Sequence, residues 1–231
     1  MTKDGLEELH SEENVNAGLI GSAVDYLSRM LLGVDKVKAF HVCLFGAKKI
    51  NLLREALVLH NGINGLDDQS IINAIKLAGF DVAFRASPLA YVPIEEINPN
   101  EKTINNVRLM TKRVLNFLDM YGPIIKEGFT FEDGGYTPTI MSGDGDILTE
   151  DTVWDIKTIR GNLNKNHTLQ LFIYWRMGLK AMPEYFKSVR YLGVFNPRKN
   201  LIRRYPTTDI PKVTIEKVES EVIMYQRLTF G

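Results

Sequence analysis

Acidic and basic side chains with the spacing of a reactive centre occur in two neighbouring segments of the chain. Asp146 lies just before an apolar pair, and after a short turn Asp155 and Lys157 alternate with Trp154 and Ile156. Side chains alternate along a strand, so Asp155 and Lys157 share one face. A hairpin would bring Asp146 beside the same end of that strand. Two carboxylates that converge on one point repel each other unless a cation lies between them.

The predicted cation is Mg²⁺ or Mn²⁺, because hard oxygen ligands suit these ions better than Zn²⁺. An ion of this kind generates hydroxide and stabilises negative charge on a phosphoryl group. Lys157 would add a positive charge that orients the water or neutralises the phosphate. The pattern therefore indicates phosphodiester hydrolysis.

A plainer interpretation is a solvated turn that carries acids on the protein surface. It explains Glu150 and Asp151, which lie in the turn itself. It explains Asp155 and Lys157 poorly, because apolar residues flank both of them within a strand.

The next helical segment carries a polar pair in an apolar setting. Gln170 and Tyr174 are four residues apart and so share one helix face, while the residues between them are apolar. Gln170 is expected to bond a metal-bound water or a phosphate. The alternative is an exposed polar stripe on an amphipathic helix.

Taken in order, these residues resemble the motif series of RecB-like nucleases, a branch of the PD-(D/E)XK superfamily. The matching residues are Gly143 and Asp146 for G-x-x-D, Asp155 and Lys157 for (D/E)-x-K, and Gln170 and Tyr174 for Q-x-x-x-Y. The span covers roughly residues 128–205, about a third of the chain. The resemblance implies that the two Asp residues hold the metal, that Lys157 assists catalysis, and that Gln170 and Tyr174 support the site.

One position departs from that family. RecB-like enzymes usually have a metal-binding His on an N-terminal helix in a G-x-x-x-H setting, and here the matching segment, Gly21–Asp25, ends in Asp. Asp25 is a competent ligand for Mg²⁺ or Mn²⁺, so it is a candidate third metal ligand. It is equally well explained as an exposed helix residue. The single cysteine, Cys43, excludes the family's iron–sulfur variants and is expected to be a buried small hydrophobe.

The elements expected to position these residues fall into two groups. The first half is predicted to be helical, with one extended segment; its elements are a helix from Asn14 or Asn16 to Leu32, helices at Ala47–Leu59, Asp67 or Asp68 to Leu77 and Glu101–Tyr121, and an extended stretch at Asp81–Tyr91. The second half is predicted to mix strands and helices; its elements are strands at 129–132, 137–142, 147–148, 153–158, 189–195 and 201–205, and helices at 167–180 and 214–227.

We therefore expect an α/β protein whose sheet is mixed, of the α+β type. It would have a PD-(D/E)XK restriction-endonuclease-like core at 123–231 and a helical N-terminal subdomain at 1–122. Lys and Arg together equal Asp and Glu at 28 each, so binding to nucleic acid would need a local basic patch. Basic residues are denser between Arg160 and Arg204, where they form either a DNA-contact stripe or a solvated face. The acidic N-terminus and the lack of a long apolar run predict a cytoplasmic protein.

The predicted function is Mg²⁺- or Mn²⁺-dependent hydrolysis of DNA, with double- or single-stranded DNA as partner and no membrane. No G-x-x-x-x-G-K-[ST] or G-x-S-x-G motif occurs, so ATP hydrolysis and serine-hydrolase chemistry are not expected. Two alternatives stay open: a catalytically silent module that binds nucleic acid or protein, and an accessory or inhibitor protein of a mobile element. Cleavage of plain DNA distinguishes the enzyme from both.

Overall fold

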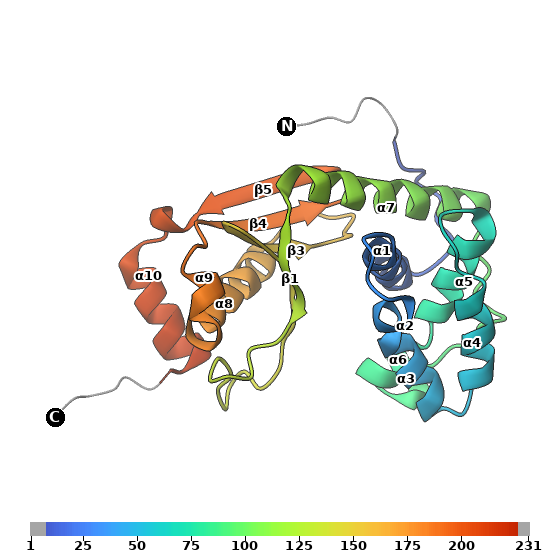
Figure 1. The fold of residues 1–231 in the computed structure, drawn as a ribbon, viewed down its shortest axis with the longest axis horizontal. Coiled ribbons are helices and arrows are strands. Elements are labelled where there is room, and N and C mark those ends of the chain that lie inside the picture. Colours follow the sequence, from blue (N-terminus) through green and yellow to red (C-terminus); the bar gives the residue numbers. More distant parts are fainter. Residues whose placement is uncertain (1–7, 226–231) are drawn as a thin grey trace. The chain divides into compact units, whose positions relative to one another are not determined.

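The computed structural model describes residues 8–225, which divide into two compact units at Phe117–Leu118. The division lies close to the predicted boundary at 122/123. The protein is an α/β fold with a five-stranded mixed sheet and flanking helices (Figure 1). No helix within residues 8–225 is long and apolar enough to cross a membrane.

The first unit is built from helices alone. They are α1 (Ala17–Leu31), α2 (Lys36–Ala39), α3 (His41–Lys49), α4 (Leu53–Asn61), α5 (Asp68–Ala78), α6 (Asp81–Arg85), a 3-10 turn at Pro88–Ala90 and α7 (Glu101–Tyr121), whose last turn belongs to the second unit. The predicted helices at α1, α5 and α7 are confirmed. Asn16 caps α1 through Gly18 N, and Asp67 caps α5 through Ser70 N, as short acceptor side chains do at helix starts.

Two predictions in this unit are wrong. The single helix expected at Ala47–Leu59 is broken between α3 and α4, where Asn51 adopts φ 60°, a left-handed conformation that an α-helix cannot continue through. The extended segment expected at Asp81–Tyr91 is helical instead. Phe80 and Ala83, three residues apart, are both buried, which is the spacing of a helix face turned to the core.

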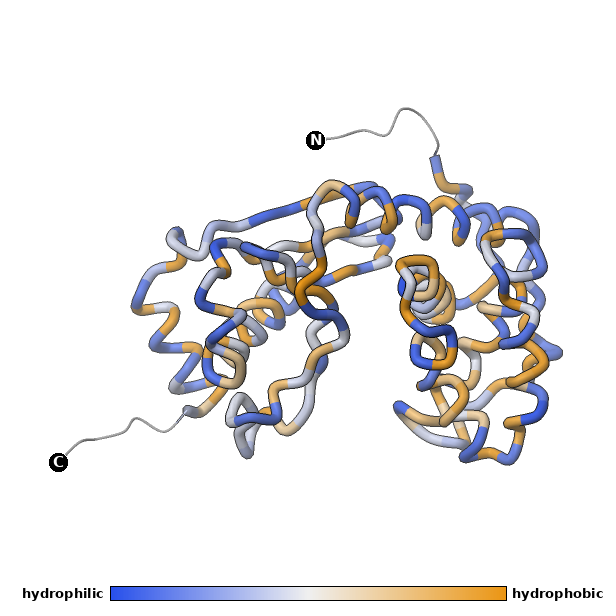
Figure 2. Tube along the Cα trace, in the orientation of Figure 1, coloured by the Kyte–Doolittle hydropathy of each residue, from blue (hydrophilic) through white to orange (hydrophobic). Residues whose placement is uncertain are grey.

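The core of the helical unit forms where amphipathic helices face one another. Helix α1 packs on α5, and their buried residues repeat at helical spacing. Figure 2 shows the same alternation, with hydrophobic positions recurring along these helices between hydrophilic ones. Cys43 on α3 is buried, as predicted.

The second unit contains the sheet. Its strands are β1 (Ile124–Phe129), β2 (Gly145–Thr149), β3 (Thr152–Ile156), β4 (Tyr191–Asn196) and β5 (Leu201–Pro206), in that spatial order. Neighbours are antiparallel except β3 and β4, which are parallel. A parallel pair needs a crossover, which here is α8 (Lys165–Ala181) with the short α9 (Pro183–Phe186). A 3-10 turn (Thr207–Asp209), α10 (Lys212–Lys217) and a π-helical turn (Val218–Ile223) follow β5.

The hairpins predicted around 149–151 and 196–200, and the helix at α8, are confirmed. The strands expected at 129–132 and 137–142 are wrong. The partner of β2 is β1, which begins directly after Gly122–Pro123, and residues 137–142 contain no strand. Pro138 lies in that segment and has no N–H to donate to a ladder. The last predicted helix ends at Ile223, before Met224 at φ 62°, and residues 226 and 227 lie outside the described residues.

Helix α8 lies against one face of the sheet and fixes the site described next. Leu148, Val153 and Val194 from the strands form one buried cluster with Leu171 and Trp175 from the helix. Because Asp155 and Lys157 follow Val153 at alternate positions, they extend from this same face at the end of β3. The packing therefore places the Gln170 end of α8 beside them.

Candidate metal centre

The β2–β3 hairpin sets the two carboxylates against each other. Ile147 pairs with Trp154, and one further step of this register places Asp146 opposite Asp155. Side chains at facing positions of antiparallel strands lie on the same face, with Cβ atoms about 4.5–5.5 Å apart. The backbone N–H of Ile156 donates to Asp146 Oδ2 at 2.7 Å, which holds this half-buried carboxylate at the end of β3.

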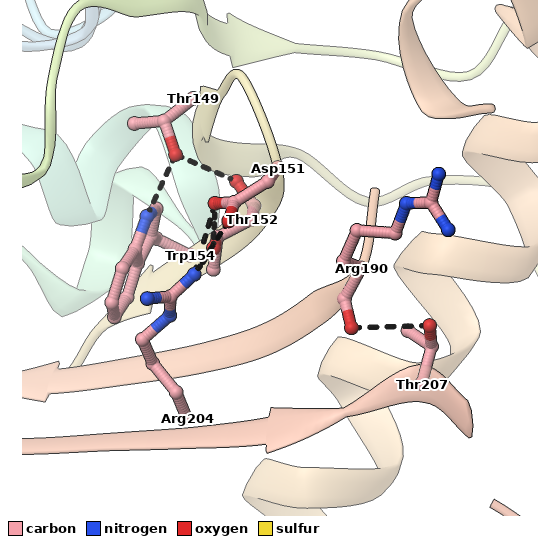
Figure 3. Close-up of polar contacts among 7 residues, drawn as sticks. All are labelled: Thr149, Asp151, Thr152, Trp154, Arg190, Arg204 and Thr207. Carbon is pink, nitrogen blue, oxygen red and sulfur yellow. Dashed lines mark hydrogen bonds and ion pairs between the residues drawn. The ribbon is translucent and has the colours of Figure 1, made fainter. Parts of the chain in front are cut away.

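A cluster of hydrogen bonds stabilises the turn of this hairpin, with Arg204 on β5 as one of its members (Figure 3). Arg204 Nη2 lies 2.9 Å from each Asp151 carboxylate oxygen and 2.8 Å from Thr152 Oγ1. The indole N–H of Trp154 donates to Thr149 Oγ1 at 3.1 Å. A one-residue slip would turn every side chain of a strand to the other face. These contacts oppose such a slip and so keep the Asp146 and Asp155 side chains on the same face of the sheet.

Asp155 is the most deeply buried charged residue of the centre, with 2% of its surface exposed. Its Oδ1 lies 2.9 Å from Lys157 Nζ. Its Oδ2 is buried and accepts no hydrogen bond from any described residue. Burial raises the pKa of the Asp155 carboxyl, while the charge of Lys157 and its hydrogen bond to this carboxyl act in the opposite direction. A buried carboxylate oxygen without a partner is costly, so this atom suits a bound cation.

Lys157 connects the hairpin to α8. Its backbone N–H donates to Phe195 O at 2.9 Å and so extends the β3–β4 ladder by one residue. Its Nζ donates to Gln170 Oε1 at 3.1 Å. Burial acts to lower the pKa of Lys157, but the Asp155 and Asp146 carboxylates outweigh it and raise the pKa. The side chain therefore carries its proton at neutral pH and serves as a cation and donor.

Gln170 and Tyr174 continue this chain of hydrogen bonds along α8. Gln170 Nε2 donates to the Tyr174 hydroxyl at 2.9 Å, one helical turn away. Burial raises the pKa of Tyr174, and the charges of Asp146 and Asp155 act in the same direction. Tyr174 is therefore a neutral phenol. The amide of Gln170 orients both neighbours at once, because its oxygen faces Lys157 and its nitrogen faces Tyr174.

The glycine segment before Asp146 packs against the same helix. A Cβ on Gly143 would lie 3.2 Å from Tyr174 Cε1, a contact tighter than most side chains make. Tyr136 donates from its hydroxyl to Gly143 O at 2.8 Å. Sequence reasoning missed Tyr136, because it lies in a loop with no periodic pattern.

Asp25 and His167 lie on two different helices, α1 and α8. Asp25 is exposed on α1 in the helical unit, and its role as a metal ligand stays a prediction. His167 is the third residue of α8, where its Nδ1 accepts from Asn164 N and completes a capping box. Within residues 8–225, no three His, Cys, Asp or Glu side chains gather as a metal site. Two carboxylates suffice for Mg²⁺, which usually keeps several waters and takes its other ligands from substrate phosphates.

Comparison with known proteins yields no relative: no family model, no curated protein and no solved structure matches this chain. The likeness to RecB-like nucleases therefore rests on the motif residues themselves.

Proposed function

We propose that this protein is a Mg²⁺- or Mn²⁺-dependent nuclease that hydrolyses DNA phosphodiester bonds. Asp146 and Asp155 would hold the metal, with Asp25 as a candidate further ligand. Lys157 would act on the reacting phosphate, and Gln170 and Tyr174 would hold the Lys157 side chain in place. The observation that carries the proposal is the buried Asp155 Oδ2, which no described residue satisfies.

The donor set fits a hard divalent cation. It consists of two carboxylates that face each other across a hairpin, one of them with a buried oxygen available. The chain's single cysteine, Cys43, belongs to the helical unit, and both donors at the centre are carboxylates, so the chemistry favours Mg²⁺ or Mn²⁺ over soft metals. When bound, the ion would stabilise charge on the phosphoryl oxygens and lower the pKa of water.

The chain's own residues divide the remaining work. Lys157 is protonated, so it would donate to a nonbridging phosphate oxygen and offset the charge that develops there. Gln170 limits the freedom of the ammonium group, and the packed Tyr174 holds Gln170. Such prior orientation lowers the barrier because the donor does not have to be reordered as charge develops.

The arrangement of elements supports the PD-(D/E)XK interpretation of the second unit. Asp146 lies on one strand, Asp155 on the next, and Gln170 and Tyr174 on the helix that follows. This is the strand–strand–helix order that the motif series predicts. The strands β4 and β5 extend the sheet beyond β3, as that interpretation also requires.

The test is incubation of linear, circular and single-stranded DNA with Mg²⁺ or Mn²⁺. We expect cleavage that EDTA stops and that Asp146→Ala, Asp155→Ala and Lys157→Ala each abolish. Mn²⁺ binding measured by calorimetry should weaken in both Asp variants. Glu150→Ala, in the exposed turn of the same hairpin, is the matched control and should leave both readouts unchanged. Full cleavage by any of the first three variants would defeat the assignment.

Asp25→Ala tests the further ligand. If Asp25 contributes to the metal, its loss should lower cleavage less than the loss of Asp155 does, because two acids of the centre remain. An unaltered rate and unaltered Mn²⁺ affinity would remove Asp25 from the site. DNA binding without cleavage under any of these conditions would favour the silent binding module instead.

A further inference from the structure

The neutral total charge of the chain conceals a strongly basic segment. Residues 156–208 hold eleven Lys and Arg residues and a single acid, Glu184, whereas the whole chain has 28 of each sign. The segment includes the end of β3, the helix α8, and the strands β4 and β5. A concentration of one sign of charge attracts a partner of the opposite sign.

Part of this charge is displayed at one end of the sheet. Two loops leave the carboxyl ends of the parallel strands β3 and β4, residues 157–164 and residues 197–200. We call these two loops, with the adjoining Lys165, the basic ledge. Arg160, Lys165 and Lys199 are exposed on it. The ledge begins at Lys157, so it is continuous with the candidate metal centre.

Side-chain hydrogen bonds connect the two loops of the ledge. Asn196, which is 2% exposed, donates from Nδ2 to Ile159 O at 2.8 Å. Its Oδ1 accepts from the backbone N–H of Arg198 at 3.0 Å. Lys199 Nζ donates to Asn162 Oδ1 at 3.1 Å. A surface ordered in advance loses less conformational entropy when it binds.

We propose that the basic ledge binds the phosphodiester backbone next to the phosphate held at the metal centre. The inference rests on the proposed function, because it takes a nucleic acid as the substrate. Cationic side chains mixed with amides are the groups that contact phosphate backbones. No acid lies on the ledge, and the exposed large hydrophobic residues among those described lie elsewhere. A membrane-binding surface would combine the charges with such apolar residues.

The test compares two triple variants with the same change in net charge. The ledge variant carries Arg160→Gln, Lys165→Gln and Lys199→Gln. The control carries Lys187→Gln, Arg190→Gln and Lys212→Gln, all exposed. The control positions lie near the amino end of β4, where Tyr191 pairs with Pro206, at the opposite end of a strand about 20 Å long. Binding of labelled duplex and single-stranded DNA to the full chain is measured by anisotropy in EDTA, so that no cleavage consumes the probe.

The readout is the slope of log K against log salt between about 50 and 200 mM, because each phosphate contact adds about 0.7 to 0.9 to its magnitude. The ledge variant should lose about 2 to 3 from that magnitude and the control should lose little. A charge-conserving triple, Arg160→Lys, Lys165→Arg and Lys199→Arg, should keep the original slope, which excludes misfolding as the cause. Equal losses in ledge and control variants, or none in either, would overturn the proposal.

The binding test and the cleavage test together separate this inference from the proposed function. Ledge-dependent binding without Mg²⁺- or Mn²⁺-dependent cleavage keeps the ledge and rejects the nuclease. Cleavage that depends on Asp155, together with identical salt slopes in the two triple variants, keeps the nuclease and rejects the ledge.

Discussion

The ion pair at the centre leads to a prediction about stability that needs no substrate. Asp155 is buried, and its partner is Lys157 Nζ at 2.9 Å. Replacing Lys157 with Met keeps most of the side-chain volume but leaves the carboxylate without its cation. Breaking a buried pair in this way usually costs about 3–5 kcal/mol. The Lys157→Met protein should therefore be less stable at neutral pH, by an amount that depends on pH.

The pH dependence follows from the direction of the Asp155 pKa. Burial already raises the pKa of this carboxyl in the folded protein, and loss of Lys157 removes the main opposing charge. The folded variant then binds more protons than the unfolded chain between the unfolded and folded pKa values, so its stability falls as pH rises through that window. The loss of stability has an upper limit, because the Asp155 carboxyl can take up a proton instead of staying charged and unpaired. At pH 7, which is about 3 units above an unfolded pKa of about 3.9, this limit is about 4 kcal/mol, at about 1.4 kcal/mol per unit.

Urea unfolding of Lys157→Met and the unaltered protein between about pH 4 and pH 7 measures this difference. We expect a deficit near zero at the acid end that grows towards neutral pH. Lys157 itself titrates only in the alkaline range, since its pKa is raised. The double variant Lys157→Met with Asp155→Asn should lose this pH dependence, because the Asp155 carboxyl, whose protonation causes it, is gone. A deficit that is constant across this range would refute the argument and show that the Lys157 stem stabilises by packing alone.

Two further predictions concern the scaffold. Gly193→Ala on β4 should lower the free energy of unfolding by about 1–3 kcal/mol, since its Cβ would lie 2.2 Å from the buried Trp154 ring; Gly161→Ala, with nothing within 4 Å, is the control and should leave urea unfolding almost unchanged. Arg204→Gln should cost about 1–2 kcal/mol in the same assay, because it removes the pair with Asp151 and a guanidinium stacked 3.9 Å from the Tyr191 ring centroid. Equal unfolding curves for the two glycine variants, or no loss for Arg204→Gln, would contradict this description of the sheet.

Local patterns in the sequence were sufficient for much of the framework. The apolar spacing of Glu101–Tyr121 predicts α7 at the bounds that the structure has, because an amphipathic helix is specified by residues three and four apart. The same holds for α8 and for the alternation that puts Asp155 and Lys157 on one face. Each depends on contacts within one element, so a single segment carries the whole signal.

Contacts between distant segments were decided only by the tertiary structure. The strand that pairs with β2 is β1 (Ile124–Phe129), and the strand expected at 137–142 does not form, because pairing depends on which segment can donate and pack across a loop. The helix break at Asn51 depends on its left-handed backbone, which Asn tolerates without requiring. The buried Oδ2 of Asp155 and the joining of residues 157–164 to residues 197–200 depend on neighbours that come together only in three dimensions. Sequence therefore determined which residues could do chemistry, and tertiary packing determined which of their atoms lack a partner and which charges lie together.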